Sequence, residues 1–210
     1  MNIKPEQLRL YAVTDRRWLN GSTLCEAVEQ AILGGATCVQ LREKELDEAA
    51  FLQQAVALKA VCTKYHVPLI INDSLEIAKR AGADGIHVGQ SDCNAQEVRR
   101  ILGADAIIGV SAATVAEAQQ AEADGADYIG CGAVFSTGTK LNTRSVDNAL
   151  LSAICHSVSI PVVAIGGIVR QNAELLKGTG IAGTAVVSAI FAQHDIKTAA
   201  QELLALEVWK

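Results

Sequence analysis

The chain has 210 residues, 50% of them hydrophobic and 4% aromatic. This length allows one sizeable hydrophobic core and is too short for two comfortable domains, so we expect a single domain over residues 1–210. Its net charge of −5 argues against a nucleic-acid partner or an anionic membrane surface, and no apolar run reaches the roughly 18 residues of a membrane span. The start lacks the apolar segment of a signal peptide and the cysteines form no Cys-x-x-Cys pair, which predicts a cytoplasmic protein with reduced thiols.

Short apolar segments of strand length alternate with segments of helical length along the whole chain. Strands are expected at residues 8–14, 36–41, 68–71, 86–88, 106–111, 127–135, 161–165 and 183–187. Helices are expected at residues 22–33, 46–64, 74–81, 94–102, from 114, 146–158, 171–177 and 195–206. Ser22 is the expected cap of the first helix, and Thr114 opens a capping box with Glu117.

Eight strand–helix pairs are the count of a (β/α)8 TIM barrel, and we predict this fold. Three helices are followed by Gly35, Gly82 and Gly125, each placed where a left-handed residue ends a helix before a strand. A doubly wound open sheet is the alternative. The absence of Gly-x-Gly-x-x-Gly after the first strand weakens its dinucleotide-binding version.

Acidic residues follow the third and fourth strands. A right-handed crossover makes these strands parallel neighbours, so Asp73 and Asp92 should emerge at the same edge of the sheet, with Asn72 beside them. Oxygen ligands of this kind suit Mg²⁺, which binds one or two carboxylates together with substrate phosphates. Either aspartate alone could instead cap a helix, but the pair predicts a magnesium site.

Basic residues follow the second strand. Alternation places Gln40 and Arg42 on the face that points into the barrel, and Lys44 follows in the loop. A buried arginine is costly unless it meets an anion, so Arg42 and Lys44 are expected to bind a phosphate or diphosphate. The alternative is a surface ion pair between Arg42 and Glu43, which would contribute little.

Later strand ends carry groups that suit a second phosphate. The sixth loop reads as an anion loop of hydroxyls and backbone N–H groups, or else as a plain surface loop; it contains Thr137, Gly138, Thr139 and Lys140. Gly167 brings bare backbone to the seventh loop, and Val187 and Ser188 open a short helix after strand eight. Loops seven and eight form the usual phosphate site of a TIM barrel, although the glycines could serve only a tight turn.

Two anion sites at one barrel mouth predict two substrates, one with a diphosphate and one with a phosphate. No Ser/His/Asp order or His-x-x-x-His spacing points to a hydrolase triad or a zinc site. His87 lies inside a strand and is expected in the core or behind the reacting groups. Ser111 places a hydroxyl at the mouth, which is weak evidence by itself. The expected chemistry is direct displacement of diphosphate, helped by Mg²⁺, Arg42 and Lys44.

A series of motifs runs in order through nearly the whole chain: Tyr11-Ala12-Val13-Thr14-Asp15, Val39-Gln40-Leu41-Arg42-Glu43-Lys44, Ile71-Asn72-Asp73, His87-Val88-Gly89-Gln90-Ser91-Asp92, Ile108-Gly109-Val110-Ser111, Thr137-Gly138-Thr139-Lys140, Ile165-Gly166-Gly167-Ile168 and Val187-Ser188. Together they resemble the thiamine-phosphate synthase (thiamine-phosphate diphosphorylase) family. The resemblance implies a TIM-barrel transferase of thiamine biosynthesis. Such an enzyme joins hydroxymethylpyrimidine diphosphate to thiazole phosphate, or its carboxylated form, in a dissociative step that yields thiamine phosphate and diphosphate.

The same resemblance implies roles for individual positions. Asp73 and Asp92 would bind Mg²⁺. The pyrimidine diphosphate would be held by Gln40, Leu41, Arg42, Glu43, Lys44, Asn72, Ser111 and Lys140, of which Arg42, Lys44, Ser111 and Lys140 would act in catalysis. The thiazole phosphate would be held by Thr137, Gly138, Thr139, Gly167, Val187 and Ser188.

Two positions depart from the family pattern: Ala113 stands where a histidine is usual, and Ser136 where a proline is usual. The missing histidine weakens any imidazole role toward the diphosphate. A thiazole tautomerase and a non-catalytic sensor of phosphate ligands remain as alternatives. The sequence leaves the oligomeric state open, a homo-oligomer included.

Overall fold

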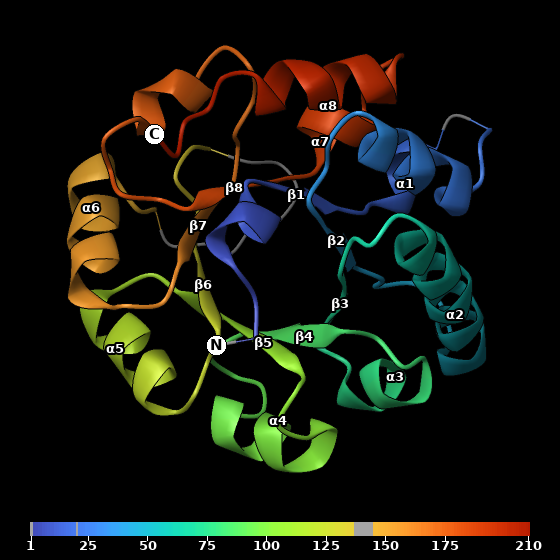
Figure 1. Cartoon of the computed structure of the whole chain (residues 1–210), viewed down its shortest axis with the longest axis horizontal. Coiled ribbons are helices and arrows are strands. Elements are labelled where there is room, and N and C mark those ends of the chain that lie inside the picture. Colours follow the sequence, from blue (N-terminus) through green and yellow to red (C-terminus); the bar gives the residue numbers. More distant parts are fainter. Residues whose placement is uncertain (1, 20, 137–144) are drawn as a thin grey trace.

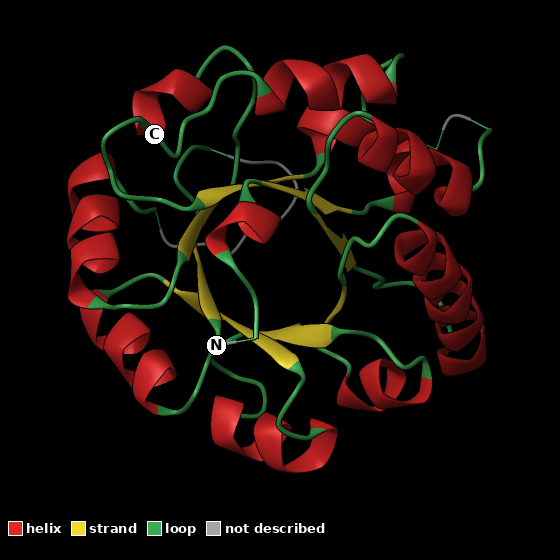
Figure 2. Cartoon of the chain, in the orientation of Figure 1, coloured by secondary structure: helices red, strands yellow, loops and turns green. Residues whose placement is uncertain are grey.

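The computed structural model describes residues 2–19, 21–136 and 145–210. In this part of the chain eight parallel strands close into a barrel in sequence order (Figures 1 and 2). The strands are β1 (Leu10–Val13), β2 (Cys38–Leu41), β3 (Leu69–Asn72), β4 (Gly85–Val88), β5 (Ile107–Ala112), β6 (Tyr128–Gly132), β7 (Val162–Ile165) and β8 (Gly183–Val186). The predicted (β/α)8 barrel is confirmed, and the open sheet is excluded because β1 pairs with β8.

The helices form an outer ring around the strands (Figure 2). They are α1 (Leu24–Leu33), α2 (Glu48–Lys64), α3 (Leu75–Arg80), α4 (Ala95–Leu102), α5 (Val115–Ala123), α6 (Asn148–Ser157), α7 (Ser188–Phe191) and α8 (Ile196–Leu204). Short 3-10 helices are η1 (Pro5–Leu8), η2 (Arg16–Trp18) and η3 (Ala173–Leu176). No helix among the described residues is long and apolar enough to cross a membrane.

Several element ends differ from the prediction. The cap of α1 is Thr23 and not Ser22, because the Thr23 hydroxyl accepts from the backbone N–H of Glu26 while the Glu26 carboxylate accepts from that of Thr23. The expected helix at 171–177 is only the 3-10 turn η3. Strand β6 ends at Gly132, three residues before the expected 135.

The predicted start of α5 is confirmed, but its capping box is incomplete. Thr114 accepts from the Glu117 N–H at 3.1 Å, whereas the Glu117 carboxylate accepts from the N–H of Ala113 at 2.7 Å instead of that of Thr114. The predicted left-handed glycines after α1, α3 and α5 are confirmed. Gly35, Gly82 and Gly125 have φ values of 104°, 61° and 89°.

The core has two layers. An outer layer of aliphatic side chains lies between the strands and the helix ring, and it includes Leu58, Ile86 and Ile129. An inner layer fills the barrel and includes Tyr11 and Tyr128. Successive strand residues alternate between these layers, as the period of a β-strand requires.

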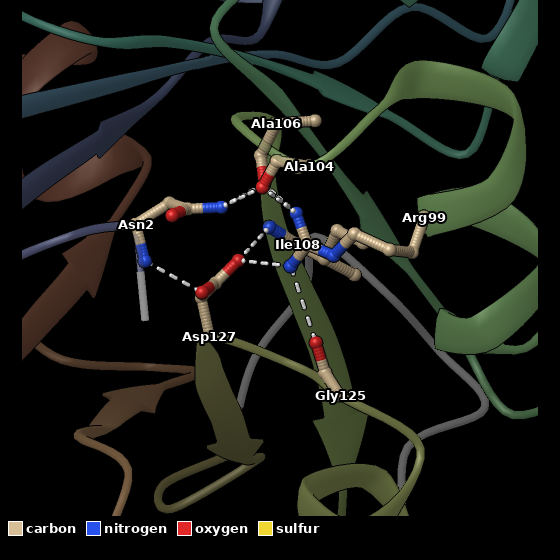
Figure 3. Close-up of polar contacts among 7 residues, drawn as sticks. All are labelled: Asn2, Arg99, Ala104, Ala106, Ile108, Gly125 and Asp127. Carbon is tan, nitrogen blue, oxygen red and sulfur yellow. Dashed lines mark hydrogen bonds and ion pairs between the residues drawn. The ribbon is translucent and has the colours of Figure 1, made fainter.

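The N-terminal end of the barrel is closed by the start of the chain. Ile3, just before η1, and Leu8, the last residue of η1, are buried in the inner core layer, and η1 lies across the barrel opening in Figure 1. Asp127, just before β6, is 2% exposed and accepts hydrogen bonds from three described residues (Figure 3). The donors are the backbone N–H of Asn2 at 2.6 Å, that of Ile108 at 2.9 Å, and Arg99 Nη2 at 2.7 Å. This end is therefore sealed, and the opposite end carries the open cavity.

Candidate active site

A cavity of about 680 Å³ opens at the C-terminal ends of the strands. In TIM-barrel enzymes this end carries the active site. Its walls include most of the described residues that the sequence singled out: Gln40, Arg42, Lys44, Asn72, Asp73, Asp92, Ser111, Gly167, Val187 and Ser188. Thr137, Gly138, Thr139 and Lys140 lie outside the described residues. The remaining two predicted residues, Leu41 and Glu43, are not part of the cavity wall.

Asp73 and Asp92 line the same cavity, as the crossover between β3 and β4 predicted. Asp73 is not a helix cap, because the hydroxyl of Ser74 caps α3 by accepting from the N–H of Ile77. Instead, Asp73 Oδ2 accepts a hydrogen bond from Lys44 Nζ at 2.8 Å. Asp92 Oδ2 accepts from the backbone N–H of Gly89 at 2.7 Å, which fixes the turn after β4.

The donor chemistry of this corner suits a hard divalent cation. Two carboxylates and the Asn72 amide supply oxygen atoms at one cavity wall. Among the described residues no group of three or more His, Cys, Asp or Glu side chains gathers as a metal-binding cluster. Mg²⁺ would therefore complete its shell with water and substrate oxygens, which is its usual behaviour.

Arg42 lines the cavity, and its acidic neighbours are paired with other arginines. Glu43 accepts from Arg16 Nε at 2.8 Å, so the alternative surface pair with Arg42 does not form. Asp15 pairs with Arg17 at 2.6 Å. Hydrogen bonds from Arg17, with a smaller contribution from the charge of Arg42, hold the pKa of Asp15 below its ordinary value. Arg42 and Lys44 are thus both placed to meet an anion in the cavity.

The opposite wall is made by the ends of β7 and β8. Gly166 and Gly167 have φ values of 103° and 64°, a backbone that side chains rarely adopt. A Cβ at Gly167 would lie 2.4 Å from the carbonyl oxygen of Ser136. Gly167 therefore lets loops six and seven approach each other, and it lines the cavity together with Val187 and Ser188.

The inner wall holds side chains that the sequence reasoning did not assign to a substrate or a metal. Tyr11 and Tyr128 line the cavity from β1 and β6. His87 on β4 lines it too and lies 2.9 Å from Ser111 Oγ through its Nε2, as expected for a residue behind the site. The alternation that placed Gln40 and Arg42 inward would also have found Tyr11, His87 and Tyr128. His66, His156 and His194 are exposed.

Comparisons with known proteins agree with this site. A family profile described as thiamine monophosphate synthase matches residues 10–190. The thiamine-phosphate synthase of Ruminiclostridium cellulolyticum is 55% identical over 201 residues, which cover 96% of each chain. That of Clostridium beijerinckii is 50% identical, over 92% of this chain and 93% of the relative.

A solved structure gives the same result. The thiamine phosphate pyrophosphorylase of Pyrococcus furiosus superposes with a TM-score of 0.89 and 35% identity, and the match covers 97% of this chain and 96% of that one. Sequence and fold therefore agree over nearly the full length. The chain belongs to the thiamine monophosphate synthase family.

Proposed function

We propose that this protein is a thiamine-phosphate synthase, a transferase that joins the pyrimidine of hydroxymethylpyrimidine diphosphate to a thiazole phosphate and releases diphosphate. Membership of the family and identity of 55% to a thiamine-phosphate synthase support the activity. The observation that carries the substrate assignment is that acidic, basic and glycine-rich strand ends line one cavity. One wall suits a diphosphate with its cation, and the other suits a single phosphate.

The chain's own residues divide the work between the two walls. Arg42 and Lys44 bind the diphosphate and neutralise the charge that it gains as it departs. Ser111 and Gln40 hold the pyrimidine, and Lys140 is assigned to the diphosphate by its family position. Asp73 and Asp92 would hold Mg²⁺, which supplies further charge neutralisation to the leaving group when bound.

The thiazole phosphate is assigned to the opposite wall. There the backbone of Gly167 and the start of α7 at Ser188 offer N–H groups, which favour an anion. Family positions add Thr137, Gly138 and Thr139 to this set. A dissociative order suits the site, since diphosphate can leave while both rings are held and the thiazole nitrogen then attacks the pyrimidine methylene carbon.

The test is an assay with both substrates and Mg²⁺ that measures diphosphate and thiamine phosphate. The proposal expects one diphosphate for each thiamine phosphate formed and none when either substrate is omitted. Interconversion of thiazole phosphate isomers without diphosphate would instead identify a tautomerase. Binding of both ligands without turnover would identify a sensor.

A further inference from the structure

Five side chains form a continuous hydrogen-bond chain through the barrel interior, from β2 to β5. Gln40 Nε2 donates to Tyr11 OH at 2.9 Å, and Tyr11 OH lies 2.8 Å from Tyr128 OH. Tyr128 OH lies 3.0 Å from His87 Nδ1, and His87 Nε2 lies 2.9 Å from Ser111 Oγ. Both ends, Gln40 and Ser111, are cavity residues assigned above to the pyrimidine.

The barrel interior has room for this row of hydrogen-bonded side chains. Tyr11, Tyr128 and Gln40 are 1%, 0% and 4% exposed, so water does not compete for their hydrogen bonds. A Cβ at Gly109 would lie 2.1 Å from the Tyr128 ring and 2.5 Å from His87 Nδ1. A Cβ at Gly130 would lie 2.7 Å from His87 Cε1. Two glycines on neighbouring strands therefore admit the His87–Tyr128 pair.

The direction of the hydrogen bonds follows from counting protons. Gln40 Nε2 can only donate, so the Tyr11 oxygen accepts. Burial raises the pKa of Tyr11 and Tyr128 well above 10, so each phenol keeps one proton to donate. The Tyr11 hydroxyl donates its hydrogen bond to the Tyr128 oxygen, because its other polar neighbour, the Cys38 sulfur, is only a weak acceptor.

The second half of the chain is then determined. Since the Tyr128 oxygen accepts from Tyr11, the Tyr128 hydroxyl donates its own hydrogen bond to His87 Nδ1, which must be unprotonated to accept it. The neutral imidazole therefore carries its proton on Nε2, and this Nε2–H group donates a hydrogen bond to Ser111 Oγ. The Ser111 hydroxyl accepts from behind and has its own proton left to donate into the cavity.

We propose that Tyr128, supported by Tyr11, is a positioning residue that holds His87 as the Nε2–H tautomer and so presents the Ser111 hydroxyl as a hydrogen-bond donor to the pyrimidine. This rests on the proposed function. A serine beside a histidine otherwise suggests a nucleophile, but in a Ser-His-Asp triad a carboxylate accepts a hydrogen bond from Nδ1–H and leaves Nε2 free as a base. Here a phenol donates to Nδ1, and the polarity is reversed.

The test is ¹⁵N NMR of the histidine side chains in the full-length enzyme without substrates, with His87 assigned by its loss in His87→Asn. The wild-type spectrum should show Nε2 protonated and Nδ1 not. In Tyr128→Phe the Nδ1 resonance should shift, because that atom loses its donor. Tyr11→Phe removes the hydroxyl that donates to Tyr128 but leaves the donor to Nδ1 in place, so the Nδ1 resonance should shift less than in Tyr128→Phe. A protonated Nδ1 in the wild type would overturn the proposal, and that spectrum decides even if a variant fails to fold.

Kinetics provide the second readout. Tyr128→Phe should lower kcat/KM for the pyrimidine diphosphate about tenfold, the equivalent of one hydrogen bond, with the KM for thiazole phosphate unchanged. Equal effects on both substrates would indicate a structural role and contradict the proposal. If the wild-type tautomer is as expected but no diphosphate forms from the two substrates, the proposed function fails and the tautomer assignment stands.

Discussion

Asp73 has a φ of 62°, a left-handed conformation that is uncommon for residues other than glycine, asparagine and aspartate. Such strain costs roughly 1–2 kcal/mol and persists where the surroundings fix it, often at functional sites. Here the backbone N–H of Asp73 donates to the carbonyl of His87 at 2.9 Å, and the side chain meets Lys44. Residue geometry at the end of β3 thus aims a carboxylate into the cavity.

Replacing this carboxylate tests its assigned role. Asparagine tolerates the same backbone conformation, so Asp73→Asn should keep the fold while it removes a charged ligand. We expect diphosphate release to fall about 100-fold or more, since several kcal/mol of charge stabilisation depend on the cation. Asp105→Asn makes the same change at an exposed residue before β5, at the other end of the barrel, and should leave the rate unchanged. Full activity of Asp73→Asn in the same assay would remove Asp73 from the metal site.

At this scale the sequence predicted the inward residues well and their partners poorly. Strand alternation placed Gln40 and Arg42 in the cavity. It could not show that Glu43 pairs with Arg16, because that contact joins two loops separated in the chain. Nor could it show that glycines at 109 and 130 leave room for His87 and Tyr128, which depends on strand register.

Among the elements, the β7–α7 wall depends on Gly167. Alanine there would adopt a φ of 64° and place its Cβ 2.4 Å from the carbonyl oxygen of Ser136. Gly82 has nearly the same φ, 61°, but a Cβ there would meet nothing within 4 Å. The two glycines therefore separate backbone strain from steric crowding.

Gly82→Ala should lower the free energy of unfolding by about 1–2 kcal/mol, from left-handed strain alone. Gly167→Ala should lower it further and should also raise the KM for thiazole phosphate, because loops six and seven are forced apart. Urea unfolding and steady-state kinetics of both variants provide the measurements. A KM change of equal size in the two variants would show that Gly167 has no local role in the phosphate wall.

Element order was predictable because the strands are short apolar runs, and three of them follow a glycine that ends the preceding helix. Element ends were less so. Ser22 and Thr23 both carry a hydroxyl, but only Thr23 has a glutamate three residues on, and the reciprocal contact with Glu26 makes Thr23 the cap of α1. The segment at 171–177 has a helical composition, but only its middle part, η3, forms a helix, and that helix is of the 3-10 type.

On the scale of the whole molecule, one end of the barrel carries the groups for activity and the other end contributes to stability. The cavity end carries strained and charged groups, whereas the sealed end carries satisfied polar contacts around Asp127 (Figure 3). Stability and activity should therefore respond to different substitutions.

Asp127→Asn tests this separation. Asparagine offers one acceptor oxygen where the carboxylate accepts from Asn2, Ile108 and Arg99, so a buried N–H would face another donor. We expect the free energy of unfolding to fall by about 2–4 kcal/mol. At temperatures where the variant is folded, kcat should stay within about twofold of the wild type, because Asp127 lies at the end of the barrel opposite the cavity. Asp105→Asn, at the exposed residue before β5 at the same end of the barrel, is the matched control. A large loss of kcat in a folded Asp127→Asn protein would contradict the division.

The most direct test of the metal–diphosphate corner is a crystal structure with Mn²⁺ and diphosphate, in which anomalous scattering locates the metal. We expect the metal between Asp73 and Asp92, with the diphosphate bound to it and to Arg42 and Lys44. A metal at any other position, or a diphosphate that contacts neither basic residue, would contradict the assignment.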